Sequence, residues 1–143
     1  MILAIGSDHA GFYQKEIIKV FLEDNNYTVI DKGTNSSVSV DYPKYGHLVG
    51  IEVVEGKAER GIVICGSGIG ISISANKIKG VRAALCNTQE QAVLSRKHND
   101  SNILALGARI IKEDLMKKII LDWLNTKFEG GRHQNRIEKI EYE

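Results

Sequence analysis

The sequence predicts an α/β protein of three layers, in which helices cover both faces of a five-stranded parallel sheet. Short apolar runs, rich in β-branched residues, alternate with helical patterns along the whole chain. The 143 residues suffice for one substantial core and not for two. Because 43% hydrophobic and 26% charged residues are typical of a globular protein, we expect a single domain over residues 1–143.

Each element of that fold has its own signal in the sequence. The strands are expected, from their β-branched runs, at residues 2–5, 27–30, 62–65, 82–86 and 103–106. The helices are expected, from the 3.6-residue period, at residues 12–24, after Pro43, from about residue 71, at 89–97 and at about 113–127. On the inner face of the first helix we place Ile17, Ile18, Phe21 and Leu22. The last helix is expected to bury Leu115, Ile119, Ile120, Trp123 and Leu124. This alternation is typical of Rossmann-like α/β/α folds.

The charge and hydropathy of the chain exclude several classes of partner. The formal net charge is +1, so no global field attracts nucleic acid or an acidic membrane surface. No apolar run reaches the roughly 18 residues of a membrane span, and residues 1–12 lack the basic and apolar regions of a signal peptide. Two cysteines, Cys65 and Cys86, fit reduced thiols better than a disulfide framework. We therefore expect a cytoplasmic protein that binds neither nucleic acid nor membranes.

A glycine loop follows the third expected strand. Gly66, Gly68 and Gly70 separate the apolar run that ends at Cys65 from the helix that follows. Such a turn points backbone N–H groups and the positive end of a helix dipole at one place, where an anion can bind. The pattern departs from G-x-G-x-x-G and lacks the Lys-Ser/Thr pair of a P-loop. A phosphate nest, a nucleotide turn and close packing of strand on helix all stay open. Cys65 faces the same donors, which favour a thiolate, although a small buried apolar residue is the plainer interpretation.

Polar residues lie near the ends of several expected strands. Ligands of open parallel sheets bind beyond the carboxyl ends of the strands. Asp8 and His9 follow the first strand, Arg109 follows the fifth, and His98 with Asn99 lies just ahead of the fifth. We therefore expect polar groups from separate segments to converge on one crevice. Asp8 as a helix N-cap, His98 at a helix C-terminus and Asn99 in a turn are the structural alternatives.

The tail, residues 130–143, has a pattern of its own. Two glycines release the chain from the last long helix, and Arg132 and Arg136 then fall four residues apart, on one face of any helix that follows. Two guanidiniums at this spacing can grip a phosphate. The alternative is a solvent-exposed basic turn whose charges balance those of Glu138 and Glu141. With little apolar content, the tail is expected to dock on the body or on another subunit.

Taken together, these segments resemble the type B ribose-5-phosphate isomerases, in the sugar-phosphate isomerase family that includes the galactose-6-phosphate isomerase subunits. The resemblance spans essentially the whole chain and is carried by residues 6–11 (GSDHAG), 41–43 (DYP), 65–70 (CGSGIG), 98–100 (HND), 104–109 (LALGAR) and 132–136 (RHQNR), with Ser72, Asn76 and Lys77. Ser67 stands where the family usually has threonine. The hydroxyl is kept and a methyl is lost, which concerns the rigidity of the loop and the rate more than the type of reaction.

The resemblance implies an aldose–ketose isomerase that interconverts ribose 5-phosphate and ribulose 5-phosphate through an enediolate, without a metal or cofactor. Cys65 would be the base that moves a proton between C1 and C2, and Ser67 would relay a proton to oxygen. The backbone of the loop, Gly66, Gly68, Ile69 and Gly70 included, would hold the enediolate oxygen. His98, with Asp8 close by, would open the closed sugar ring.

The resemblance also implies how the substrate is held and how chains assemble. The phosphate would be bound by His9, Arg109, Arg132 and Arg136. Sugar hydroxyls would be contacted by Asn99 and by Asp41 or Tyr42. The site would be shared in a homodimer, with Asp8, His9 and Cys65 of one chain facing His98, Asn99 and Arg109 of the other. The sequence leaves the choice between dimer and tetramer open.

Three alternatives remain. Within the family, the substrate would be galactose 6-phosphate or allose 6-phosphate. Outside it, the fold also suits a phosphate- or nucleotide-binding module without catalysis, which needs no thiol at the loop. A cysteine-based transferase or phosphatase would use Cys65 as a nucleophile, but residues 66–70 offer no arginine for the phosphate cradle of such an enzyme.

Overall fold

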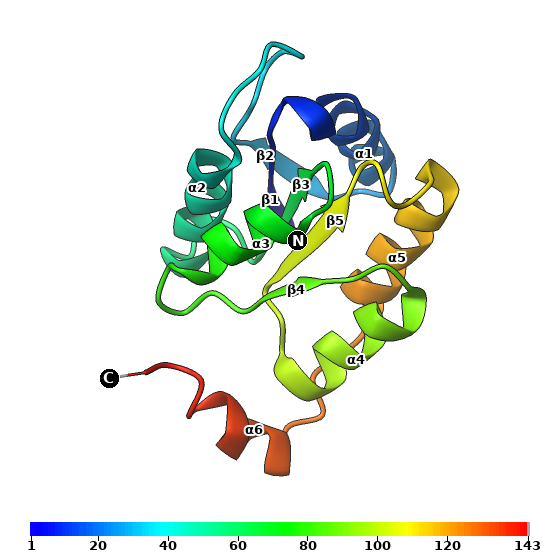
Figure 1. Ribbon diagram of the computed structural model, residues 1–143. Coiled ribbons are helices and arrows are strands. Elements are labelled where there is room, and N and C mark those ends of the chain that lie inside the picture. The colour runs from blue at the N-terminus through cyan, green and yellow to red at the C-terminus, as the bar shows by residue number, and fades with distance from the viewer. Residues whose placement is uncertain (143) are drawn as a thin grey trace.

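A computed structural model describes residues 1–142 and confirms the three-layer α/β/α fold (Figure 1). All strand pairs are parallel, and the strands lie in the order β2-β1-β3-β5-β4. The strands are β1 (Ile2–Ser7), β2 (Thr28–Asp31), β3 (Arg60–Cys65), β4 (Ala83–Leu85) and β5 (Ile103–Gly107). The five expected strands are therefore all present, with ends that differ by one or two residues.

Helices cover both faces of this sheet, as Figure 1 shows. They are the 3-10 turn η1 (His9–Gly11), α1 (Phe12–Asp24), α2 (Tyr42–Val54), α3 (Ile69–Asn76), α4 (Gln89–Asn99), α5 (Glu113–Asn125) and α6 (Arg132–Ile137). Alternate residues of the strands feed two cores. Leu3 and Ile5 pack on the side of α1, α4 and α5, whereas Ala4 and Cys65 pack on the side of α2 and α3.

The prediction that Ile17 and Leu115 are buried is wrong. Ile17 on α1 and Leu115 on α5 are 39% and 36% exposed, although their neighbours Ile18 and Met116 are fully buried. The inner stripe of α1 instead includes Lys15, whose side chain is fully buried and pairs with Asp31 at 2.7 Å. Lys15 precedes Ile18 and Leu22 by three and seven residues, so the buried stripe of α1 includes a lysine that pairs with the carboxylate at the end of β2, and Ile17 lies off this stripe.

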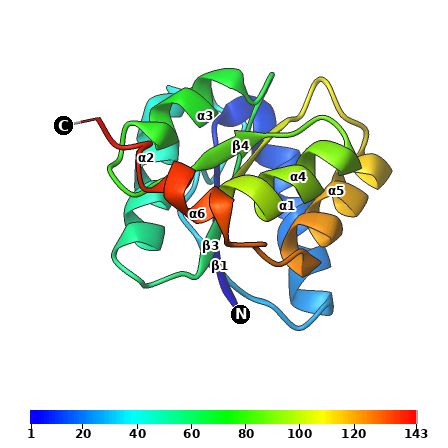
Figure 2. The ribbon, with the colours of Figure 1, turned by 90° about the horizontal axis from the view of Figure 1, so that it is seen from below.

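The tail lies beside the end of α4, as Figure 2 shows for α6. The loop that leads into the tail is bonded to α4: the backbone N–H of Glu129 donates to the carbonyl of Lys97 at 3.1 Å, and Arg96 Nε donates to the carbonyl of Thr126 at 3.2 Å. Further along, Glu141 accepts the N–H of Gly80 at 2.7 Å. Residue 143 of the expected tail lies outside the described residues. In residues 1–142, every helix is too short or too polar to cross a bilayer.

Candidate active site

A cavity of about 660 Å³ opens at the carboxyl ends of β1, β3 and β5. Its volume is in the range of small-molecule sites. It is lined by Asp8, His9, Ala10, Tyr42, Cys65, Gly66, Ser67, Ile69, Gly70, Ile73, Arg109 and Ile110. Nine residues named from the sequence therefore meet in one place, where the rule for parallel sheets predicts a ligand.

Cys65 ends β3 at the base of this cavity. Its side chain is buried, and its sulfur accepts the backbone N–H of Gly68 at 3.1 Å. Gly68 has φ +79°, and a Cβ there would lie 2.6 Å from Leu85 Cδ1 and 2.8 Å from the carbonyl carbon of Leu106. Only glycine fits this position, so the turn that aims an N–H at the sulfur depends on Gly68.

The next residues of the loop extend the same arrangement. The N–H of Ile69 donates to Ser67 Oγ at 3.1 Å, which holds the hydroxyl at the start of α3. Gly70 lies under the ring of Tyr42, since a Cβ on Gly70 would be 2.6 Å from Tyr42 Cε1. Two N–H groups of the loop are thus directed at the sulfur and the hydroxyl. The loop can hold negative charge at both atoms.

Asp8 and His9 form the wall that follows β1. Asp8 is 7% exposed, and its Oδ1 accepts the N–H of Gly11 at 3.2 Å, so it does cap a helical turn. His9 Nδ1 lies 3.1 Å from both the N and the O of Val40. The loop before α2 is therefore fixed to the imidazole. Nε2 is the ring nitrogen left to face a ligand.

Arg109 supplies the positive charge of the cavity. Its backbone N–H donates to the carbonyl of Gly66 at 2.9 Å, and a Cβ on Gly66 would lie 3.2 Å from its Nη1. The guanidinium thus lies against the glycine loop of its own chain. The expectation that Arg109 faces Cys65 from another chain is wrong, because the turn after β5 is bonded directly to the end of β3 within one chain.

The expected convergence of all polar segments in one crevice is also wrong for a single chain. His98, Asn99 and Arg136 line a different hollow of about 330 Å³, with His133, Ile137 and Ile140. The reason is the direction of α4. This helix runs antiparallel to the strands, so its last residues lie at the amino ends of β4 and β5. Of the remaining predicted residues, Asp41 is exposed at the N-cap of α2 and Arg132 is exposed on α6.

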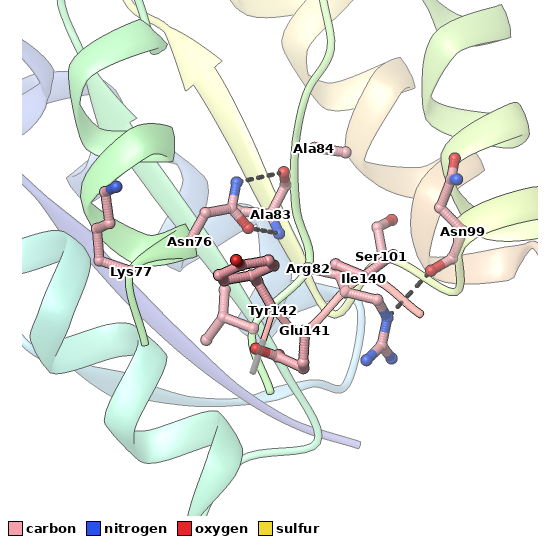
Figure 3. Close-up of a pocket in the computed structure, with 11 residues that line it drawn as sticks. Asn76, Lys77, Arg82, Ala83, Ala84, Asn99, Ser101, Ile140, Glu141 and Tyr142 are labelled. Atoms are coloured by element: carbon pink, nitrogen blue, oxygen red, sulfur yellow. Dashed lines mark hydrogen bonds between the residues drawn. The ribbon is translucent and has the colours of Figure 1, made fainter. Parts of the chain in front are cut away.

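A further hollow of about 690 Å³ lies beside β4, between α3 and the tail (Figure 3). Several of its polar groups bind one another. The side-chain amide of Asn76 donates to the carbonyl of Ala83 at 3.0 Å and accepts the N–H of Ala83 at 2.8 Å. Arg82 Nε donates to the carbonyl of Asn99 at 3.1 Å. These pairs tie β4 to α3 and to the end of α4.

His98 lies in a cluster with Glu129 and His133 that the sequence pattern does not predict. Its ring stacks on His133 with a centroid distance of 4.4 Å. Glu129 Oε1 lies 3.6 Å from His98 Nε2 and 3.7 Å from His133 Nε2. Desolvation and the neighbouring His98 lower the pKa of His133, which favours its neutral form. The four-residue spacing of Glu129 and His133 was the available sequence signal, but nothing in the sequence pairs them with His98.

Known proteins are similar to this chain in both sequence and fold. Residues 3–140 match the family model described as Ribose/Galactose Isomerase. The ribose-5-phosphate isomerase B of Escherichia coli is 49% identical over 138 residues, which is 96% of this chain and 93% of that protein.

Solved structures agree with this match. The ribose-5-phosphate isomerase B of Clostridium thermocellum has a TM-score of 0.97 and 51% identity, with 98% of this chain and 95% of that one covered. The Mycoplasma genitalium enzyme, solved with bound ribulose 5-phosphate, has a TM-score of 0.93 and 41% identity, with 97% and 93% covered. The chain belongs to the ribose/galactose isomerase family.

Proposed function

We propose that this protein interconverts ribose 5-phosphate and ribulose 5-phosphate, with Cys65 as the base. One observation carries the proposal: a buried thiol accepts a backbone N–H at 3.1 Å in a cavity that also holds a carboxylate, an imidazole and a guanidinium. Relatives of the same family carry the name of this activity, and one of them was solved with the ketose product.

The reaction moves two protons without a net change of oxidation state. From the aldose, the Cys65 thiolate removes the proton on C2 while the carbonyl oxygen on C1 gains a proton. The enediolate oxygen is stabilised by loop N–H groups, and one such donor contributes about 3 kcal/mol. Cys65 then returns its proton to C1, and the oxygen on C2 loses its proton to become the ketone. Ser67, held by the N–H of Ile69, relays protons between the two oxygens.

The substrate phosphate binds at the end of the cavity that carries Arg109 and His9. A guanidinium offers paired donors to a phosphate, and His9 is fixed through Nδ1 by Val40. Tyr42, whose ring covers Gly70, contacts the sugar hydroxyls together with the neighbouring Asp41.

The remaining predicted residues act from a second chain in a homodimer or tetramer. His98, Asn99, Arg132 and Arg136 belong to the opposite end of their own chain. The rim of the cavity at Cys65 is apolar and open, with Ile69, Ile73 and Ile110 at least half exposed. A partner chain that covers this rim would bring its His98 to the sugar for ring opening, and its arginines to the phosphate. Both cysteines are free thiols, as a cytoplasmic enzyme with a thiolate base requires.

Steady-state kinetics on ribose 5-phosphate, allose 6-phosphate and galactose 6-phosphate test the substrate. We expect the highest kcat/KM for ribose 5-phosphate, and a hexose phosphate ahead of it would overturn the assignment. Galactose 6-phosphate is the second candidate, since the family description includes galactose. Solvent deuterium should enter the product at the carbon that receives the proton. A phosphate-binding module without catalysis would bind all three sugars and convert none.

A further inference from the structure

The cluster at the end of α4 joins three separate segments of the chain. His98 comes from α4, Glu129 from the loop after α5, and His133 from α6. One ligand atom from each lies within 4.8 Å of the other two. Within residues 1–142, this is the single set of three histidine, cysteine or acidic residues that meets this condition.

The distances are close to those of a metal site. Glu129 Oε1 lies 3.6 Å and 3.7 Å from the two Nε2 atoms, so the same ring nitrogen of both histidines lies near one carboxylate oxygen. Zinc bonds to nitrogen and oxygen of about 2.0–2.2 Å place tetrahedral ligand atoms roughly 3.3 Å apart. The two contacts to Glu129 therefore need to shorten by only a few tenths of an ångström. The separation of the two rings needs the larger adjustment.

The backbone holds two of the three ligands in place. The N–H of Glu129 donates to the carbonyl of Lys97, next to His98, at 3.1 Å. Gly130 and Gly131 have φ of +68° and +57°, and this turn brings His133 back over α4. The His133 side chain is 9% exposed and is the fixed partner, whereas His98 at 41% has room to rotate towards a shared ion.

The donor set selects the class of ion. Two imidazoles and one carboxylate suit zinc and related divalent transition metals, whereas magnesium and calcium prefer sites made of oxygen. Three protein ligands leave a fourth position for water, as in zinc sites that are open to solvent.

We propose that His98, Glu129 and His133 bind a divalent ion of the zinc class, which joins α6 to α4 and withdraws His98 from the substrate. The first half of this proposal, the metal site, stands on the cluster alone. The second half rests on the proposed function, in which His98 opens the sugar ring. An ion bound there would lower the turnover of the closed sugar.

Metal binding is measured first, without substrate, on the full chain treated with a chelator. Zn²⁺ is titrated against a chromophoric competitor, and we expect one ion per chain. Glu129→Gln and His133→Phe should each weaken binding at least about tenfold. The phenylalanine keeps a ring stacked on His98, and far-UV circular dichroism shows whether each variant folds. His47→Asn, in a histidine on α2, is the matched control and should bind as the wild type does.

The absorption spectrum of bound Co²⁺ shows whether the ion is held by this cluster or by the thiol of Cys65. Co²⁺ bound by two imidazoles and a carboxylate gives d–d bands with no thiolate charge-transfer band, and Cys65→Ala should leave the spectrum unchanged. A charge-transfer band that disappears in Cys65→Ala would place the ion in the cavity at Cys65 and overturn the proposal. Binding that survives both Glu129→Gln and His133→Phe would overturn it equally.

Inhibition is measured separately. Each enzyme is compared with itself in chelator, with ribose 5-phosphate as substrate. Zn²⁺ should cause a loss of activity in the wild type and in His47→Asn, and little loss in His133→Phe. If Zn²⁺ binds the cluster without inhibition, the metal site stands and the coupling to His98 is wrong. If the chelator-treated wild type does not isomerise ribose 5-phosphate at all, the proposed function has failed while the binding result is unaffected.

Discussion

The two ends of the sheet are built in different ways. At the carboxyl end, the cavity is fixed by backbone: Gly68 and Ile69 donate to Cys65 and Ser67, and the turn after β5 is bonded to the end of β3. At the amino end, His98 is held by ring stacking on His133 and by Glu129 from the loop after α5. Proton transfer at carbon needs the precision of the first arrangement. In the proposed function, the second arrangement carries the residue that opens the sugar ring before that transfer.

The largest loss of kcat is expected on substitution of one of the two buried cysteines, Cys65, and not of the other. Cys65→Ala removes the proposed base, and we expect kcat to fall at least about 10³-fold while sugar phosphate still binds, measured by kinetics and calorimetry. Cys86→Ala is the matched control. Burial raises the pKa of Cys86 to about 11, so it stays protonated and serves packing. If Cys65→Ala kept most of its kcat, another group would have to be the base.

The second test asks whether the two ends act across a dimer. Cys65→Ala and His98→Ala chains, each inactive alone, are unfolded and refolded together. If the two residues serve one site from different chains, a mixed dimer has one intact site. With random pairing about half of the dimers are mixed, so activity should return to roughly a quarter of wild type. Activity that stays near zero, with mixed dimers shown to have formed, would assign the whole catalytic set to one chain.

A third test measures how far the carboxyl end depends on one turn. Gly68→Ala should lower kcat by about 10–100-fold, because a Cβ there meets Leu85 and the backbone at Leu106 and would turn the N–H away from Cys65. Gly56→Ala is the control, since φ is +75° but nothing lies within 4 Å of the added Cβ. It should show only the cost of a left-handed backbone, about 1 kcal/mol in urea unfolding. Equal kcat in the two variants would remove the role given to the Gly68 turn.

The smallest effect on catalysis is expected at Asp31, which ends β2 outside the cavity. Burial opposes its ionisation, but hydrogen bonds from Lys15 and Lys19 outweigh it, so the pKa of Asp31 lies below its ordinary value of 3.8. Its stabilising contribution is thus complete above that value and is lost as the pH falls through the lowered pKa.

Asp31→Asn should therefore destabilise the protein at neutral pH by about 2 kcal/mol, with kcat unchanged. The difference in Tm between the variant and the wild type should shrink only below about pH 4. A difference that was independent of pH down to pH 2 would mean that the ionised carboxylate contributes nothing.

Much of the carboxyl end could be predicted from the sequence. Apolar runs and their period located the strands and helices, and the rule for parallel sheets brought Asp8, Cys65 and Arg109 together. At the amino end of the sheet, the prediction from the order of residues in the chain was wrong. His98 precedes β5, and a residue that precedes a parallel strand lies at the amino edge, so it could not share a crevice with Cys65 of its own chain. The burial of Lys15 was hidden for another reason, since it depends on Asp31, which belongs to a different element.

The bond pattern of Asn76 has a consequence for aggregation. β4 is an edge strand of the sheet, and an exposed edge is a template on which another chain can add a strand. Asn76 donates to the carbonyl and accepts from the N–H of Ala83, which are the two groups that an incoming strand would pair with. The side-chain amide of Asn76 thus makes the two hydrogen bonds that the backbone of a neighbouring strand would make, and it occupies this part of the edge. At Ala83 an incoming strand would find neither backbone group free, which opposes extension of the sheet at this edge.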